Sequence, residues 1–196
     1  ARDLIGRAAG PVFIFAGLFG FAQGLDQILD LAAALPADVP GRFVLVGEGP
    51  ERERLAGRIE RERIERVRIV PSQPRERIPA LLAAADAAII SLGMSIPGAV
   101  PSKIYEAMAS SLPIFLVADG EPARRIQDAK CGIAVKSGDA AGLRQAFLEF
   151  AADPGLRKRL GAAGRLAAET TYNRDRIAAR LDEFLTNLLA KKSCAA

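Results

Sequence analysis

The sequence predicts an α/β protein built on a Rossmann-like, doubly wound sheet of six parallel strands, with extra helices at the C-terminal end. Three observations point to this fold. Short apolar runs alternate with helix-like segments up to residue 139, the runs are mostly apolar on both faces, and no further run of this kind follows. Strands that helices cover on both faces have this composition.

The predicted strands are short and rich in β-branched, aliphatic or aromatic residues. They are 12–16 (VFIFA), 43–46 (FVLV), 67–70 (VRIV), 87–90 (AAII), 114–117 (IFLV) and 132–135 (GIAV). Helices are predicted between them at 24–35, 51–63, 75–85, 102–111 and 121–129. This alternation is typical of a parallel sheet with right-handed crossover connections.

Two amphipathic helices are predicted after the sheet region, with a turn at 153–155 (DPG) between them. Their apolar positions are Leu143, Ala146, Phe147 and Phe150 in the first, and Ile177, Leu181, Phe184, Leu185 and Leu188 in the second. We expect both apolar faces to pack into the core. No internal repeat or long linker appears, so residues 1–196 are predicted to form a single domain.

Composition narrows the possible functions. The chain has 27 Lys and Arg against 23 Asp and Glu, a net charge of +4, and no basic block with interleaved aromatic residues, so a nucleic-acid partner is not expected. No apolar run approaches the roughly 20 residues of a membrane helix, and the N-terminus lacks a signal-peptide pattern. The expected location is the cytoplasm.

The chain contains no histidine. This excludes Ser–His and Cys–His nucleophile pairs within it and removes the commonest side-chain ligand of transition metals. Its two cysteines, Cys131 and Cys194, do not have the spacing of a metal site. We expect neither a metal nor a cofactor.

Two glycine-marked loops are expected to meet in the sheet. In a doubly wound sheet of strand order 3-2-1-4-5-6, a ligand binds where the connections after strands 1 and 4 diverge. The first loop (GLFGFAQG) contains Gly17 and Gly20, and the second (SLGMSIPGAVPS) contains Gly93 and Gly98. Glycine lets backbone amides approach a phosphate closely, although the spacing is not the dinucleotide G-x-G-x-x-G pattern. The alternative is that these glycines only form turns.

The second loop leads into a helix that starts in PSKIYEAMA. Pro101 suits a first helical turn, Ser102 can bond a free amide there, and Lys103 adds positive charge to the helix N-terminus. Together they would suit a diphosphate. Glu106 follows about one turn later, where a carboxylate could accept hydrogen bonds from sugar hydroxyls. The alternative is a capped helix with an exposed Lys103–Glu106 pair worth about 0.3 kcal/mol.

Four motifs in this order resemble the C-terminal domain of family 4 glycosyltransferases, which have the GT-B fold. They are FAGLFGFAQGLDQIL, FVLVGEGPERERL, IPALLAAADAAII and VPSKIYEAMASSLPIF, and the similarity spans about residues 10–185. The sequence is most similar to the branch that makes bacterial surface polysaccharides, including transferases for acetamido and deoxy sugars. The resemblance implies a retaining hexosyl or N-acetylaminosugar transferase that binds a nucleotide sugar, expected to be a UDP-sugar, without a catalytic metal.

The resemblance also implies partners. A separate N-terminal acceptor-binding domain, absent from this chain, would bind a glycan or lipid-linked acceptor and could contact the inner face of the membrane. The chain alone is therefore expected to bind nucleotide but to transfer little or nothing.

The candidate site residues follow from the glycine loops and from the resemblance. Gly17, Gly20, Ser102 and Lys103 are expected to hold the diphosphate, and Lys103 and Glu106 are the candidate catalytic residues, with Glu106 on the ribose. The resemblance places the base near Ser72 and Gln73, and Glu48 near the nucleotide, although Glu48 could simply belong to a turn. Pro101 and Gln23 complete the candidate nucleotide-binding set.

The sequence departs from the family pattern at three positions. Family members carry two glutamates separated by seven residues; the second matches Glu106, but Gly98 stands where the first would contact the donor sugar. Leu18 and Gln23 stand where the family has an Arg and a Lys directed at the phosphates. Lys103 and the backbone amides of 98–102 are expected to supply part of the missing positive charge.

Two alternatives remain open. A GT-B-fold epimerase acting on UDP-N-acetylglucosamine has the same architecture, but it relies on acidic and histidine residues that this chain does not show. A non-catalytic nucleotide-binding or scaffold domain, paired with an active partner, is compatible with the missing Glu, Arg and Lys.

Overall fold

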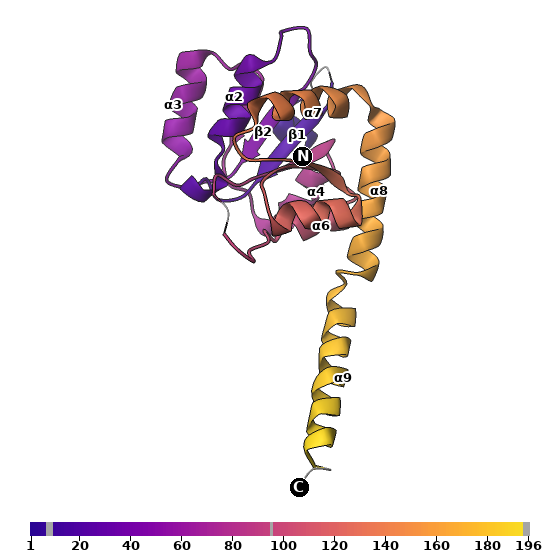
Figure 1. Cartoon of the computed structure of the whole chain (residues 1–196). Helices are drawn as coiled ribbons and strands as arrows, with labels where there is room; N and C mark the ends of the chain where they lie inside the picture. Colours follow the sequence, from indigo (N-terminus) through magenta and orange to yellow (C-terminus); the bar gives the residue numbers. More distant parts are fainter. Residues whose placement is uncertain (7–9, 95, 194–196) are drawn as a thin grey trace.

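The computed structural model describes residues 1–6, 10–94 and 96–193, and Cys194 lies outside them. A single sheet forms the centre of the body, with helices on both faces, while the last helix extends away from it (Figure 1).

The sheet has the predicted topology. Its strands are β1 (Val12–Ala16), β2 (Arg42–Val46), β3 (Val67–Val70), β4 (Ala87–Ser91), β5 (Ile114–Val117) and β6 (Gly132–Val135). All neighbouring strands are parallel, in the order β3-β2-β1-β4-β5-β6. The α/β prediction, the strand order and each strand range, to within one residue, are confirmed.

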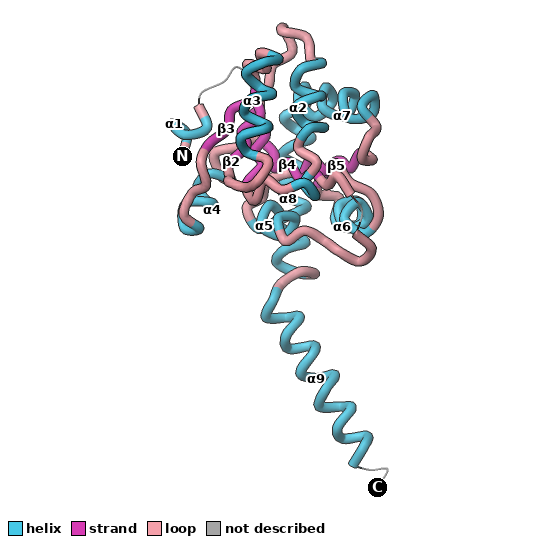
Figure 2. Tube along the Cα trace, turned by 90° about the vertical axis from the view of Figure 1, so that its left-hand side faces the viewer, coloured by secondary structure: helices cyan, strands magenta, loops and turns pink. Residues whose placement is uncertain are grey.

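Helices form two layers, one on each face of the sheet (Figure 2). One face carries α2 (Asp26–Ala34), α3 (Arg52–Glu62) and α7 (Ala140–Ala152), and the other carries α1 (Arg2–Ile5), α4 (Ile78–Leu82), α5 (Lys103–Ala109), α6 (Glu121–Ala129) and α8 (Pro154–Thr170). Two 3₁₀ turns, η1 (Phe21–Gln23) and η2 (Arg75–Arg77), precede α2 and α4. The five helices predicted between strands are confirmed, with ends up to three residues inside the predicted ranges.

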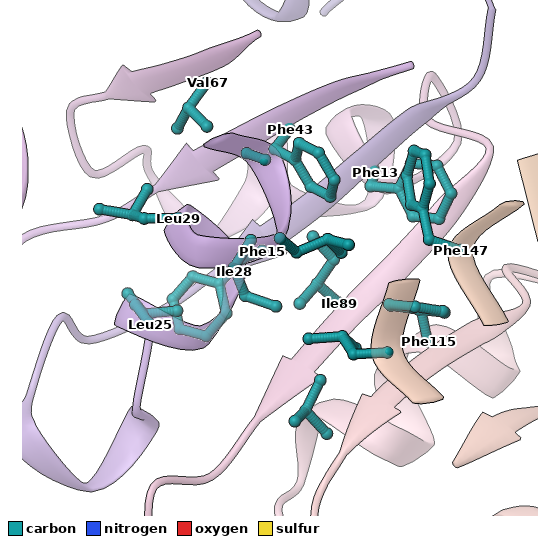
Figure 3. Packing of buried hydrophobic residues seen from close by; sticks show 14 of the residues in the cluster. Phe13, Phe15, Leu25, Ile28, Leu29, Phe43, Val67, Ile89, Phe115 and Phe147 are labelled. Carbon is teal, nitrogen blue, oxygen red and sulfur yellow. The ribbon is translucent and has the colours of Figure 1, made fainter. Parts of the chain in front are cut away.

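The core under α2 and α7 is built around Phe13 of β1 (Figure 3). Because side chains alternate along a strand, Phe13 and Phe15 enter this cluster while Ile14 enters the cluster on the opposite face. The Phe13 ring centroid lies 5.6 Å from that of Phe43 and 4.8 Å from that of Phe147. The four residues predicted to form the apolar face of α7 are all buried, so that prediction is confirmed.

The apolar periodicity does not predict α8. The predicted turn at 153–155 is where this helix starts: Asp153 accepts a hydrogen bond from the Leu156 amide (2.8 Å), and Pro154 is the first helical residue. The helix packs through glycines against α5 and the turn after it, since a Cβ at Gly164 would lie 3.5 Å from the Met108 Cα and one at Gly161 would overlap the Ser111 carbonyl oxygen. Contact through small residues leaves no stripe of large apolar side chains in the sequence.

The prediction that the last helix packs into the core is wrong. Helix α9 (Arg174–Ser193) points away from the sheet (Figure 1), and its apolar face is not covered by any other element of the described chain. The side chains of this face, Ile177, Leu181, Phe184, Leu185 and Leu188, are 47–60% exposed. A periodic pattern identifies an apolar face but not the surface that covers it.

Removal of residues 174–196 is expected to change the thermal unfolding midpoint of the chain by no more than about 2 °C, because these apolar side chains are already exposed. Circular dichroism melting of the full and shortened chains at equal concentration measures this. A chain ending at residue 152, which also lacks α8, is the control and is expected to melt at a clearly lower temperature, since α8 covers α5. A large loss of stability on removing α9 alone would contradict the exposed arrangement.

Candidate functional site

The loops that follow β1 and β4 lie against each other at the carboxyl edge of the sheet. The Gly93 amide donates to the Ala22 carbonyl oxygen (2.8 Å), and the Ser91 hydroxyl donates to the Gly24 carbonyl oxygen (3.2 Å). Gly24 has φ +54°, and a Cβ there would come within 2.6 Å of the Gly93 Cα. A side chain at Gly24 would therefore push the loops apart. The two loops expected to meet at the switch point do meet.

A cavity of about 360 Å³ opens between these loops and the connection from β5 to α6. The candidate residues that line it are Gln23, Pro101, Ser102 and Lys103. The other lining residues are mostly apolar or small, apart from Asp119 and Ser137 on the loops after β5 and β6. A cavity of this size with a few polar groups is suited to a small-molecule ligand.

Lys103, the first residue of α5, places a positive charge in the cavity wall. Its Nζ lies 5.4 Å from the centroid of the Phe15 ring, at the end of β1. Burial lowers the pKa of Lys103, and the nearby Glu106 charge opposes this shift. Within residues 1–6, 10–94 and 96–193, no carboxylate forms a salt bridge with this ammonium group. An anion entering the cavity would therefore meet a cation that is not already paired.

The Lys103 side chain lies against the loop after β1, where glycines leave space for it. A Cβ at Gly17 would overlap the Lys103 side chain, and the φ of Gly17 is +151°, which disfavours other residues. On the other side of this loop, a Cβ at Gly47 would overlap the Gly17 carbonyl oxygen. Gly17 thus acts by making room for Lys103 over the end of β1.

The helix start at Ser102 differs from the prediction. The Ser102 backbone is already helical (φ −58°, ψ −26°), whereas a capping serine is usually extended, and its hydroxyl bonds no free amide. The hydroxyl instead lies 3.5 Å from Oε1 of Glu106. Glu106 is exposed and is not among the described residues that line the cavity, but it lies about one turn after Lys103 on the same helix.

The first loop supplies no side-chain cation to this site. Leu18 is 60% exposed, and Gln23 turns back so that its Oε1 accepts a hydrogen bond from the Gly20 amide (3.0 Å). The Gly20 amide, which we expected to face a phosphate, is therefore occupied by a side chain of its own loop. This pairing also fixes the η1 turn at the cavity edge.

Three candidates lie at the same sheet edge but outside the cavity lining. Glu48, which follows β2, is exposed and pairs with Arg52 at 3.1 Å. Ser72, which follows β3, is exposed, and the neighbouring Gln73 donates to the Pro71 carbonyl oxygen (3.0 Å). A ligand that reached these residues and Lys103 would have to extend across the ends of β1, β2 and β3.

The sequence interpretation missed the contribution of β5. Asp119 lines the cavity because β5 is the neighbour of β4, so the loop after β5 ends beside the loop after β4. The predicted strand order contained this adjacency, and applying it to the fifth strand would have identified Asp119.

The described part of the chain brings together no group of three His, Cys, Asp or Glu side chains able to hold a metal ion. None of its helices is long and apolar enough to cross a bilayer.

Comparison with known proteins identifies a family. Residues 7–167 match the family described as "Glycosyl transferases group 1", and this segment is more than half of the chain. A search of curated proteins gives no match.

Solved structures share the fold. Sucrose-phosphate synthase from Thermosynechococcus elongatus is 25% identical, with a TM-score of 0.79 over 97% of this chain and 48% of that one. HepE from Anabaena, solved in complex with UDP, is 20% identical, with a TM-score of 0.79 over 91% and 49%. WaaG, described as a glycosyltransferase involved in lipopolysaccharide biosynthesis, is 20% identical, with a TM-score of 0.73 over 86% and 45%. The chain spans about half the length of each of these proteins.

Proposed function

Since the chain belongs to the group 1 glycosyl transferases, we propose that it is the donor-binding domain of a retaining, family 4 transferase that uses a UDP-sugar. The observation that carries this proposal is Lys103: a partly buried ammonium group, with no salt bridge to any described carboxylate, in a cavity where the β1 and β4 loops meet. A nucleoside diphosphate supplies the anion that this arrangement lacks.

The proposed role of Lys103 is to stabilise the leaving group. When the donor sugar is transferred, the bond from its anomeric carbon to the diphosphate oxygen breaks, and the electron pair remains on that oxygen. A cation fixed in place before this charge develops stabilises the transition state more than a mobile one. Lys103 is fixed before the reaction because its side chain lies closely between Gly17 and the Phe15 ring. Ser102 lines the same cavity.

The nucleoside is proposed to extend from the cavity across the ends of β1 to β3. Glu106 would accept hydrogen bonds from the ribose hydroxyls, a positioning role. Ser72 and Gln73 would lie near the base, and Glu48 near the nucleotide. Gly20 shapes the first loop, because its amide already bonds Gln23.

The structural neighbours support the proposed base and acceptor. HepE has been solved with UDP, with UDP and glucose, and with UDP-glucose, which favours uridine as the base. WaaG is described as involved in lipopolysaccharide biosynthesis, which favours a surface glycan or lipid-linked acceptor. Because the chain spans about half the length of these proteins, the acceptor is proposed to bind a further domain.

The nucleotide preference tests this function. Calorimetric titration of the 196-residue chain with UDP, GDP and ADP is expected to show binding with UDP as the tightest ligand. Tightest binding of GDP would keep the transferase class and replace the donor. Absence of binding at millimolar concentrations would contradict the proposal and leave the non-catalytic scaffold domain as the better hypothesis.

A further inference from the structure

The cavity contains one carboxylate that the proposed function has not used. Asp119, in the loop between β5 and α6, is the only acidic residue among the described residues that line it. Among the same described residues, Lys103 supplies the single cationic side chain. The described cavity therefore offers one positive and one negative group on different elements.

Asp119 is held by the loops around it. Its Oδ2 accepts a hydrogen bond from the Ser137 amide (3.3 Å), and the next residue, Gly120, has φ +72°, which turns the chain into α6. No hydrogen bond joins Oδ1 to any other residue that the structure describes. One oxygen thus anchors the side chain, and the other is available to a donor in the cavity.

Gln27 of α2 braces this arrangement. Its Oε1 accepts hydrogen bonds from the Ser137 hydroxyl (3.1 Å) and the Gly138 amide (2.7 Å). Its Nε2 lies 3.4 Å from the Gly24 carbonyl oxygen and 3.5 Å from that of Leu92. One side chain thereby ties the loops after β1, β4 and β6 together, and fixes Ser137 beside Asp119.

The β4–α5 loop contributes no acidic side chain to the described cavity lining. Gly98 in that loop is exposed, with φ +76°, and a Cβ there would touch nothing within 4 Å. Because hydroxyl groups are hydrogen-bond donors, a ligand rich in hydroxyls would find a charged acceptor at Asp119, the one carboxylate among the described lining residues.

From this division of charge we propose that Asp119 accepts hydrogen bonds from the hydroxyls of the donor sugar and sets the choice of sugar. This rests on the proposed function, since it requires a nucleotide sugar in the cavity. The diphosphate would lie at Lys103, and the sugar would extend toward the β5–α6 loop. A carboxylate placed at the sugar end does not favour the anionic diphosphate itself, so its removal should affect UDP and a UDP-sugar differently.

Asp119→Asn separates the sugar contact from the structural one. Asparagine keeps an oxygen that can accept from the Ser137 amide, but it loses the negative charge. The unmodified chain is expected to prefer one of two UDP-sugars, UDP-glucose or UDP-N-acetylglucosamine. The affinity of the variant for that preferred sugar is expected to be about 10-fold lower, as for a lost charge-assisted hydrogen bond. Affinity for UDP is expected to stay the same or to rise. Asp128→Asn, an equal charge change at an exposed position of α6, is the control and should alter neither.

Calorimetric titration of the three 196-residue proteins with UDP and both UDP-sugars gives these values, and thermal melting verifies that each variant is folded. Equal losses for UDP and the UDP-sugar, or no loss for either, would overturn the role of Asp119 while leaving the transferase function intact. The role of Asp119 would also be overturned if the unmodified chain bound UDP but bound neither UDP-sugar more tightly than UDP. Failure to bind UDP at all would overturn the proposed function, and this inference with it.

Discussion

Phe13→Ala is expected to lower the free energy of unfolding by about 4 kcal/mol, the usual size of a buried Phe to Ala change. Phe13 is 0% exposed on the central strand β1, and its ring contacts the rings of Phe43 on β2, Phe115 on β5, and Phe147 and Phe150 on α7. Truncation would leave a cavity where the side chains of three strands and a helix meet, and would remove aromatic pair contacts as well. Urea denaturation measures the loss.

Phe184→Ala supplies the control. The chemical change is the same, but Phe184 lies on α9 and is 60% exposed, so the free energy of unfolding is expected to change by less than about 0.5 kcal/mol. Similar losses for the two variants would contradict the assignment of Phe13 to the core and of α9 to the surface.

Lys103→Ala is expected to weaken UDP binding by about 1–2 kcal/mol, or roughly 5- to 30-fold, because it removes a charge-assisted contact with the diphosphate. Calorimetric titration measures the change. Lys158→Ala removes an equal charge from an exposed position on α8 and should leave the affinity unaltered. Unchanged UDP affinity in Lys103→Ala would contradict a contact between Lys103 and the diphosphate.

The pH dependence of UDP binding gives the same residue a second signature. Burial lowers the pKa of Lys103 from 10.5, so the ammonium group loses its proton at lower pH than an exposed lysine would. The diphosphate prefers the charged form, and affinity is therefore expected to fall already at pH values below 10.5, where an exposed lysine would still be protonated. In Lys103→Arg the fall should be absent, because arginine stays protonated to above about pH 12. An equal fall in both proteins would assign the titration to another group.

Much of the fold could be predicted because its determinants are local. Apolar runs such as VFIFA at 12–16 match the strands almost residue for residue, and the buried face of α7 follows from its spacing. The same spacing in α9 led to a wrong prediction, since no described element covers that helix. Helix α8 was missed because it packs through Gly161 and Gly164, which leave no apolar periodicity.

The candidate site was less predictable because it depends on contacts between distant loops. The position of Lys103 at a helix start could be predicted from PSK, but its path over Gly17 and Phe15 could not. Asp119 was overlooked because only the β4–β5 adjacency brings it to the cavity. The predicted hydroxyl cap of Ser102 fails for a similar reason: its backbone joins the helix, so its hydroxyl turns toward Glu106.

The diphosphate site at Lys103 is tested most directly by comparing the affinities of the unmodified chain for UDP and for UMP by calorimetric titration. The two ligands share the base and the ribose and differ by one phosphate. UDP is expected to bind at least about 10-fold more tightly, because the second phosphate adds a charge-assisted contact with the ammonium group. Equal affinity for UDP and UMP would contradict a diphosphate site between the β1 and β4 loops.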